Sequence, residues 1–229
     1  MKKITAVIIA RKNSKRLPNK MYQKINGKSL IETKISHLLK TNVDEIAVGS
    51  DDLKLKKICQ KFNDKRIRFY LRPDYYCDER VASANDTIKN MLSYINSDII
   101  LWAYPTNPFT TSIHYNEALK LYFENIKKGY DGLFSTTKIL NYFWNMNKKP
   151  INHNPMEKKH TRLSERKIPY LYVDNGAIFI RDYKSMYKDG RHWSKKGFMY
   201  IMDEKSGWDI NFKWDLEAAK LKSFNNKKF

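Results

Sequence analysis

Cysteine is scarce in this sequence, and long hydrophobic runs are absent. Cys59 and Cys77 are the only cysteines among 229 residues, with no Cys-x-x-Cys motif and no histidine nearby at ligand spacing. A disulfide framework or a structural zinc site is therefore not expected, and a reducing cytoplasmic compartment is the default expectation. No stretch approaches the roughly 20 apolar residues that a membrane-spanning helix needs, so no membrane partner is expected.

Acidic residues are also few. The sequence has 24 aspartates and glutamates against 44 lysines and arginines, which gives a formal net charge of +20. Such an excess favours polyanionic partners, such as nucleic acid, acidic lipid or phosphorylated small molecules. The lysines are spread along the whole chain, so solvated surface is the alternative explanation for much of this charge. Apolar residues make up 41% and aromatic residues 14%, which indicates a folded chain rather than a disordered one.

Strand and helix patterns alternate along the first 140 residues. Apolar runs predict strands at 4–10, 45–50, 66–71, 98–104 and 132–138. Helical spacing predicts helices at 29–41, 53–62, 83–95 and 113–129. Further strands are expected at 170–180, with an interruption near Asn175-Gly176, and at 199–203, followed by a helix at 214–222. This alternation predicts an α/β fold with a mostly parallel sheet and helices on both faces.

The pattern breaks in the second half of the chain, at about residues 140–168. This segment is rich in proline, asparagine, lysine and aromatic residues and shows no clear periodicity. At such a length it is expected to be a lid or a subunit-contact arm rather than an ordinary loop. Because neither an internal repeat nor a domain linker is visible, residues 1–229 are expected to form a single domain that carries this insertion.

A cationic loop follows the first predicted strand in "AVIIARKNSKRLPNK", residues 6–20. Its positive charges are Arg11, Lys12, Lys15, Arg16 and Lys20. In open α/β folds, the loop after a buried strand lies at the edge of the sheet where ligands bind. Five cations in ten residues can surround a triphosphate, although a solvated charged loop is the alternative interpretation.

Two further motifs bear on nucleotide chemistry. Gly27-Lys28-Ser29 resembles the end of a P-loop, but Tyr22 occupies the position where that motif needs a glycine. A turn followed by a helix cap is expected instead, with Ser29 and Glu32 forming a capping box. In "GWDINFKWD", Asp209 and Asn211 stand two residues apart and face the same side of an extended chain, where they could hold a divalent cation. An ordinary turn is the alternative.

The sequence resembles a known family in six motifs. "ARKNSKRLPNK", "VGSDD", "LRP", "YPTNP", "NGAIFI" and "WDINFKWDLEAAK" occur in the order and spacing of the CMP-sialic acid synthetases. More broadly, they resemble the cytidylyltransferases that include the CMP-KDO, CMP-legionaminate and CMP-pseudaminate enzymes. The resemblance implies a Rossmann-like fold and a homodimer formed through an arm at about 140–168. It also implies transfer of CMP from CTP to an acidic sugar or related small acid, with release of pyrophosphate, for surface glycan biosynthesis.

The resemblance also implies roles for individual residues. It gives the triphosphate and nucleotide contacts to Arg11, Ser14, Lys15 and Lys20, and a cytidine contact to Ser83. Mg²⁺ is the implied cofactor, with Asp209 as its leading ligand and Asn211 beside it. Arg11, Lys20 and Asp209 are the implied catalytic residues, whereas Tyr104, Asn107 and Asn175 are assigned to the substrate.

The sequence departs from the family at several of these positions. Lys20-Met21 replaces a Lys-Asn pair, Tyr104 and Asn107 replace a glutamine and a serine, and Asn211 replaces the second aspartate of the metal motif. The Arg-Gln pair that the family carries before "NGA" has no clean match, since Glu165-Arg166 or Arg162-Leu163 stand nearest. Nucleotide transfer is therefore favoured more strongly than a sialic acid acceptor.

Two alternative functions remain open from the sequence. Aromatic residues lie between basic residues at 142–172, as they do in proteins that stack single-stranded nucleic acid. No RNP, KH or helix-turn-helix signature supports this hypothesis, so nucleic acid is not the expected partner. The other alternative is a nucleotide-binding relative without catalytic activity, because Asn211 removes one charge from the metal motif.

Overall fold

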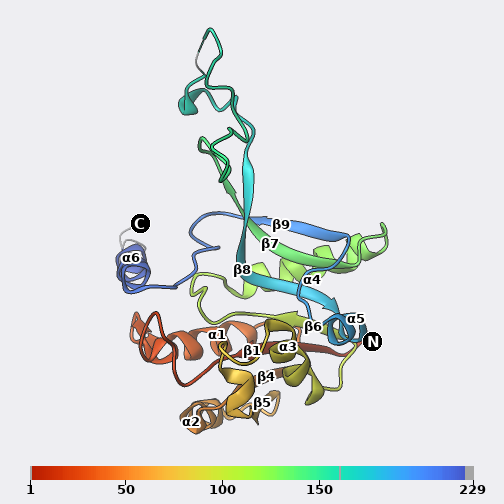
Figure 1. The fold of residues 1–229 in the computed structure, drawn as a ribbon. Helices are drawn as coiled ribbons and strands as arrows, with labels where there is room; N and C mark the ends of the chain where they lie inside the picture. The colour runs from red at the N-terminus through yellow and green to blue at the C-terminus, as the bar shows by residue number, and fades with distance from the viewer. Residues whose placement is uncertain (1, 160, 225–229) are drawn as a thin grey trace.

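A seven-stranded sheet forms the centre of the protein in this computed structural model, which describes residues 2–159 and 161–224. The strands, in the order in which they pair, are β5 (Ile67–Leu71), β4 (Glu45–Ser50), β1 (Ile4–Ile9), β6 (Ile99–Trp102), β8 (Leu171–Asp182), β7 (Gly132–Ile139) and β9 (Gly197–Met202). The helices are α1 (Leu30–Leu38), α2 (Leu53–Lys61), α3 (Ala84–Ser93), α4 (Ser112–Ile126), α5 (Tyr183–Asp189) and α6 (Lys213–Phe224). Figure 1 shows these elements, with a long arm projecting from one edge.

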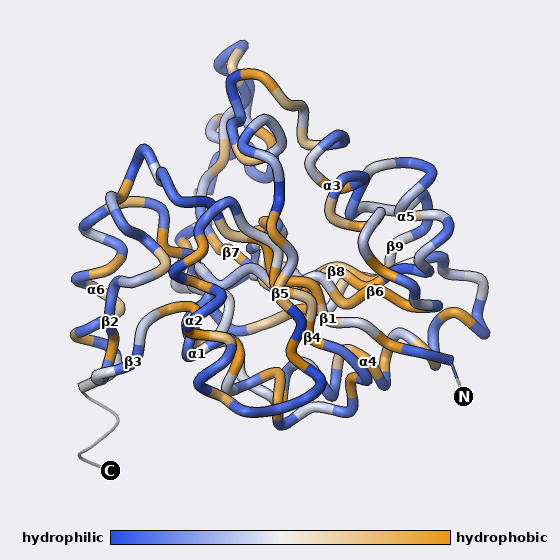
Figure 2. The backbone as a smooth tube through the Cα atoms, turned by 90° about the horizontal axis from the view of Figure 1, so that it is seen from below, coloured by the Kyte–Doolittle hydropathy of each residue, from blue (hydrophilic) through white to orange (hydrophobic). Residues whose placement is uncertain are grey.

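Helices cover both faces of the sheet, as the sequence predicts. The alternation of side chains along β1 shows why: Ala6 and Ile8 pack into the core beneath α1, α2 and α4, whereas Val7 packs into the core beneath α3 and α5. The central strands are therefore apolar on both sides, as is typical of parallel strands between two helical layers. Seen from below, the hydrophobic segments gather in these strands (Figure 2).

The sheet is mostly parallel, and the Rossmann-like fold predicted from the sequence is confirmed. The pairs β1–β4, β1–β6, β4–β5 and β7–β9 are parallel. Strand β8 is the exception, since it runs antiparallel to both β6 and β7. The predicted interruption near Asn175 is a shift in the β7–β8 register rather than a strand end, and Gly176 adopts a φ of 66° there.

The turn and helix cap predicted at Gly27-Lys28-Ser29 are confirmed. Short strands β2 (Lys24–Ile25) and β3 (Lys28–Ser29) form a hairpin whose turn residues, Asn26 and Gly27, both have positive φ. Ser29 then caps α1 through a reciprocal capping box with Glu32. This segment therefore starts a helix and is not a P-loop.

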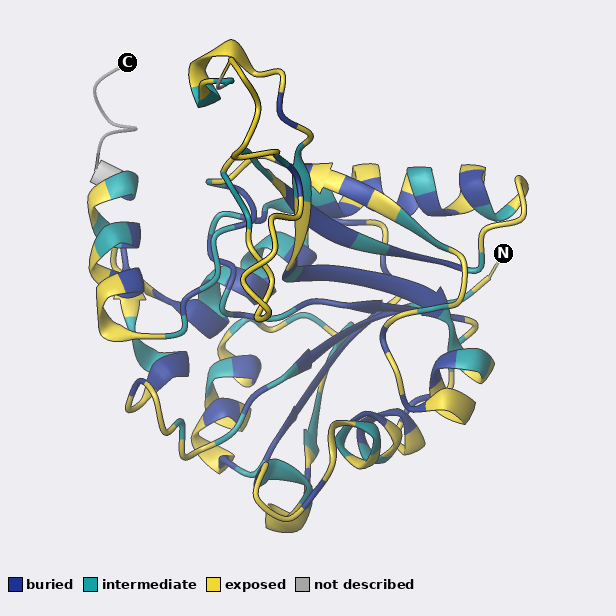
Figure 3. Cartoon of the chain, turned by 45° about the horizontal axis from the view of Figure 1, so that its top comes forward, coloured by how far each residue is buried: buried dark blue, intermediate teal, exposed yellow. Residues whose placement is uncertain are grey.

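The arm is the continuation of β7 and β8 beyond the sheet. The two strands stay paired from Thr136 and Asp174 outward to Ile139 and Leu171, and the chain between them forms the projection in Figure 1. Colouring by burial shows the arm as mostly exposed, while the central strands are buried (Figure 3). The segment 140–168 lies between the end of β7 and the start of β8, and its residue 160 is outside the described residues.

Two expectations from composition can be compared with the structure. Both cysteines are free, with Cys59 buried and Cys77 half-buried. Within residues 2–159 and 161–224, no helix has the length and apolar character needed to cross a membrane.

Candidate functional site

A cavity of about 520 Å³ lies where β1, β5 and β6 end. Arg11 follows β1, Arg72 follows β5, and Tyr104 to Thr106 follow β6, and all of them line this cavity. The carboxyl ends of parallel strands meet at one edge of a sheet, which is where open α/β folds bind ligands. The structure brings five of the expected site residues to this cavity: Arg11, Ser14, Lys20, Ser83 and Tyr104.

The first loop supplies the positive charge of this cavity. Arg11, Arg16 and Lys20 all line it, whereas Lys15 is exposed close by. Arg11 forms an ion pair of 2.8 Å with Glu79, and the amine of Lys15 lies 3.7 Å from the same carboxylate. The hydrogen bond from Arg11 lowers the pKa of Glu79, so this carboxylate is charged at neutral pH.

Lys20 is the most enclosed of these cations. Its side chain is buried, and its Nζ donates a hydrogen bond of 2.9 Å to the carbonyl of Ile210. Burial lowers the pKa of Lys20, and the nearby carboxylate of Asp209 opposes that effect. Lys20 therefore joins the cationic loop to the 209–211 segment, which lies 190 residues later in the chain.

The 209–211 segment is held in a tight turn before α6. The carboxylate of Asp215 accepts hydrogen bonds from the backbone N–H groups of Asn211, at 2.8 Å, and Phe212, at 2.7 Å. Asp215 thereby satisfies two backbone donors at the start of the helix, as a capping side chain does. Asp209 and Asn211 are brought together by this turn, because the Asn211 amide donates to the Asp209 carboxylate at 2.6 Å.

The oxygen atoms of this turn fit a hard divalent cation whose remaining ligands come from a substrate. Asp209 offers a carboxylate. Asn211 offers its side-chain carbonyl oxygen when the amide group rotates so that this oxygen faces the cation. No cluster of three or more acidic, histidine or cysteine side chains capable of holding a metal occurs in the described part of the chain. Mg²⁺ is commonly bound by one or two carboxylates together with substrate phosphates, so such a cluster is not required.

Asn107 lies beneath the site rather than on its surface. The residue is fully buried, and its Nδ2 donates to the carbonyl of Asn175 at 2.9 Å, with longer bonds to the carbonyls of Gly207 and Trp208. The carbonyl of Asn107 in turn accepts a hydrogen bond of 3.0 Å from the amine of Lys34. Asn107 therefore ties the turn after β6 to the segment that leads to Asp209.

Asn175 is also buried, and its side chain is hydrogen-bonded to neighbouring residues of β7. Its Oδ1 accepts a bond of 2.6 Å from Ser135, and its Nδ2 donates to Thr137 at 3.0 Å. Asn107 and Asn175 are both buried and neither lines the cavity, and their assignment to the substrate stays a prediction. Gly207 packs against this network so closely that a Cβ there would lie 2.4 Å from Thr137 and 2.5 Å from Asn175.

Lys34 supports this network from inside the protein. Its side chain has no solvent exposure, and its amine donates to the Tyr115 hydroxyl as well as to Asn107. Burial lowers the pKa of Lys34 to about 7. A buried amine without an acidic partner is costly unless its hydrogen bonds are satisfied, and here two neutral oxygens satisfy it.

Ser83 and Tyr104 are at the cavity but also have structural roles. The Ser83 hydroxyl caps α3 by accepting from the backbone of Asp86 at 3.1 Å. Tyr104 packs edge-on against the rings of Phe179 and His192, and burial raises its pKa. Both residues therefore present fixed surfaces to a ligand, and their assignments to cytidine and substrate stay predictions.

Glu79 and Arg72 line the cavity but were not predicted from the sequence. Arg72 is buried, and its guanidinium bonds to Asn90 and to the carbonyls of Tyr76 and Thr87, so it fixes the segment that forms one wall of the cavity. The arginine of "LRP" was visible as a motif, but no signal indicated its partners. Glu79 had no signal at all, because its ion pair joins residues 68 positions apart whose proximity depends on the fold.

The fold and this cavity define the class of the protein. A Rossmann-like α/β sheet with a cationic cavity at the carboxyl ends of its strands is an arrangement for binding a phosphorylated ligand. Comparison with known proteins identifies the family. The profile of the cytidylyltransferase family matches residues 5–195, and the chain belongs to this family.

Individual relatives support this assignment. The chain is 31% identical over 95% of its length to the N-acylneuraminate cytidylyltransferase of Escherichia coli, and it spans about half of that relative, 51%. It is 24% identical to the pseudaminic acid cytidylyltransferase of Campylobacter jejuni, with 94% of both chains covered. A solved structure of CMP:2-keto-3-deoxy-manno-octonic acid synthetase complexed with CTP shares the fold, with a TM-score of 0.66, 16% identity and coverage of 98% and 99%.

Proposed function

We propose that this protein transfers CMP from CTP to an acidic sugar or a related small acid and releases pyrophosphate. The observation that carries the proposal is the cationic cavity at the carboxyl edge of the sheet, lined by Arg11, Lys20 and Ser83. The relatives named above act on acids of this kind, which supports the acceptor class. The family match disfavours the alternative of a single-stranded nucleic-acid-binding protein.

The residues of the cavity have complementary roles in this reaction. Arg11 and Lys15 bind the outer phosphates, and Lys20 offsets the charge that develops as pyrophosphate leaves. Asp209 and Asn211 would hold Mg²⁺, which supplies polarisation of the phosphate when bound. Because Lys20 also bonds to Ile210, the phosphate-binding loop and the metal-binding turn are kept in one arrangement.

We also propose a cytoplasmic location. The two free cysteines are consistent with the reducing environment of the cytoplasm.

Two measurements test the activity. Pyrophosphate release should occur with CTP, Mg²⁺ and a panel of sugar acids, and should depend on the acceptor. CTP should also raise the melting temperature clearly more than ATP, GTP or UTP at the same concentration, because a ligand stabilises the folded state that binds it. Equal shifts with all four nucleotides would contradict a preference for cytidine, and a lack of pyrophosphate with every acceptor would contradict the transfer.

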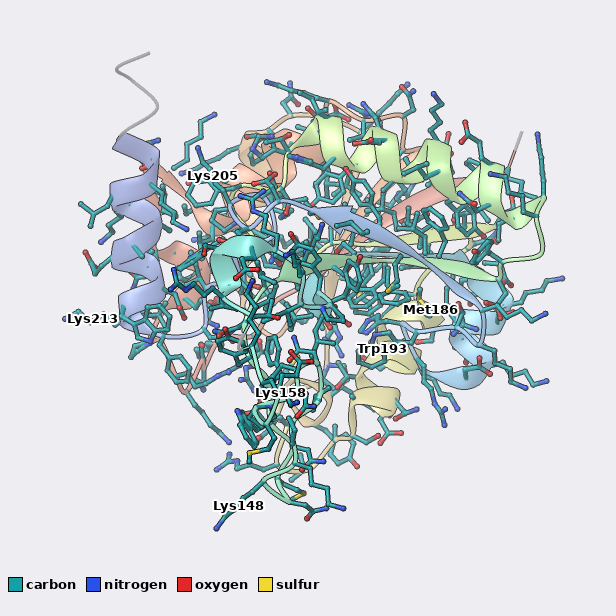
Figure 4. The ribbon with its side chains drawn as sticks, turned by 90° about the horizontal axis from the view of Figure 1, so that it is seen from above. Lys148, Lys158, Met186, Trp193, Lys205 and Lys213 are labelled. Carbon is teal, nitrogen blue, oxygen red and sulfur yellow. The ribbon has the colours of Figure 1, made fainter. Side chains whose placement is uncertain are left out.

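We further propose that the arm at about 140–168 joins two copies of the chain into a homodimer. Met146 and Met156 are 95% and 86% exposed, and Trp144 and Ile151 are about half exposed on the same arm. Exposed apolar residues gathered on one projection are typical of a surface that contacts another molecule. Lys148 and Lys158 also lie along the arm (Figure 4), so the contact surface is both apolar and basic.

Substitutions on the arm test the dimer. The variant Met146→Glu/Met156→Glu should shift the protein from a dimer to a monomer in light scattering, because charges there would be buried at the interface. Both side chains are exposed, so the fold of the protomer should be unaffected. Ile113→Glu is a matched control, since Ile113 is also largely exposed but lies on α4. A monomeric wild-type protein would contradict the proposal.

A further inference from the structure

One acidic side chain stands among the cations of the cavity. Of the described residues that line it, only Glu79 is acidic, whereas Arg11, Arg16, Lys20 and Arg72 are cationic. The Glu79 carboxylate contacts two of the cations that a triphosphate would need: it lies 2.8 Å from Arg11, and Lys15 lies 3.7 Å from it. An acid in this position opposes the binding of a polyanion, so it calls for a physical explanation.

The backbone around Glu79 directs its side chain to this place. The segment 78–82 is a tight turn in which the Asp78 carbonyl accepts the N–H groups of Val81 at 3.2 Å and Ala82 at 3.0 Å. The Asp78 side chain pairs with Arg80 in the same turn. The neighbouring acid is therefore already neutralised locally, and Glu79 remains the carboxylate that reaches across to the first loop.

We propose that Glu79 is an internal competitor for the phosphate groups of the nucleotide and thereby sets the affinity for CTP and for pyrophosphate. The inference rests on the proposed binding of a nucleoside triphosphate in this cavity. Glu79 offsets part of the positive charge of Arg11 and Lys15 while it contacts them, so phosphate oxygens compete with this carboxylate for the two cations. The side chain is 58% exposed, so it can swing into solvent without leaving a buried charge.

The competition acts on both ends of the reaction. A triphosphate is held by the base, the sugar and the whole cationic loop, so it can displace one exposed carboxylate. Pyrophosphate lacks the nucleoside contacts, so return of Glu79 to Arg11 favours its departure. Glu79 is thus an affinity-determining residue rather than a catalytic one, since it withdraws from the phosphate that Arg11 binds.

A charge-neutral variant tests this proposal. Glu79→Gln should lower the Kd of both CTP and inorganic tripolyphosphate by about 3- to 10-fold in titration calorimetry, because an ion pair and a repulsion are both removed. Pyrophosphate should also become a stronger product inhibitor by a similar factor. Asp78→Asn is the matched control: it removes the same charge one residue away, keeps the acceptor for the Arg80 N–H, and should change each Kd by less than about 2-fold.

A double-mutant cycle identifies the partner. If Glu79 acts through Arg11, the gain from Glu79→Gln should shrink when Arg11 is already replaced by glutamine. Unchanged Kd values in Glu79→Gln, or equal tightening in Asp78→Asn, would overturn the proposal even if CTP is a substrate. Tighter tripolyphosphate binding without any preference for CTP would instead support Glu79 as the competitor and contradict the proposed nucleotide.

Discussion

Replacing Lys20 with alanine is expected to lower turnover by about 100-fold or more, as the loss of one group that stabilises developing charge typically does. Lys20 is buried in the cationic cavity, where a charge acts with little screening by water. The same change removes the hydrogen bond to Ile210, so the turn that carries Asp209 is no longer bonded to the first loop through this side chain. Steady-state pyrophosphate release at saturating CTP and acceptor is the measurement.

Lys20→Gln separates the loss of the charge from the loss of the hydrogen bond to Ile210, and Lys12→Ala is the control. Lys20→Gln removes the charge and keeps a hydrogen-bond donor in the side chain, so activity close to that of Lys20→Ala would assign the loss to electrostatics. Lys12→Ala removes an exposed cation of the same loop and should retain most activity. If Lys20→Ala is folded and as active as Lys12→Ala, the loop is a solvated surface and not a phosphate site.

Removing the charge of Asp209 is expected to have an equally large effect. Asp209→Asn should nearly abolish turnover, because the 209–211 turn then offers two neutral amides and no carboxylate to a divalent cation. Asn211→Asp should act in the opposite direction and lower the Mg²⁺ concentration for half-maximal activity by about 3- to 10-fold, since affinity follows the charge of the ligands. Mg²⁺ titrations of both variants decide the matter.

The same variants have a signature that does not depend on activity. Asn211→Asp replaces the amide that donates to Asp209 with a second carboxylate, so the two charges repel until a cation binds. The melting temperature of this variant should therefore rise more steeply with Mg²⁺ than that of the wild type. An unchanged Mg²⁺ requirement together with an unchanged melting profile would show that residue 211 is not a ligand.

The fold was predictable because local patterns determine most of it. The apolar runs of β1 and β6 and the capping box at Ser29 and Glu32 depend on residues close in sequence, and the structure confirms them. The antiparallel course of β8 and the helix α5 were not predicted. The direction of β8 is set by which strands it meets, and no periodicity within residues 171–182 encodes that choice.

The candidate site was predictable only in part, for a related reason. The cations of the first loop stand together in the sequence, and the fold places Arg11 and Lys20 at one cavity. Buried polar contacts are different, because they join segments that are far apart. Asn107 was assigned to the substrate, and no local pattern indicated that its amide bonds to backbone carbonyls 68 and about 100 residues away.

The position of β8 has a consequence for the synthesis of this protein. Strands β6 and β7 both pair with β8 in the finished sheet, yet β8 ends only at Asp182. A ribosome adds about 5–20 residues per second, so a nascent chain holds β6 and β7 with unpaired edges for seconds before their shared neighbour emerges. Unpaired strand edges attract other chains. The N-terminal half therefore cannot complete its own sheet, and a message truncated before Leu171 encodes a chain prone to aggregate.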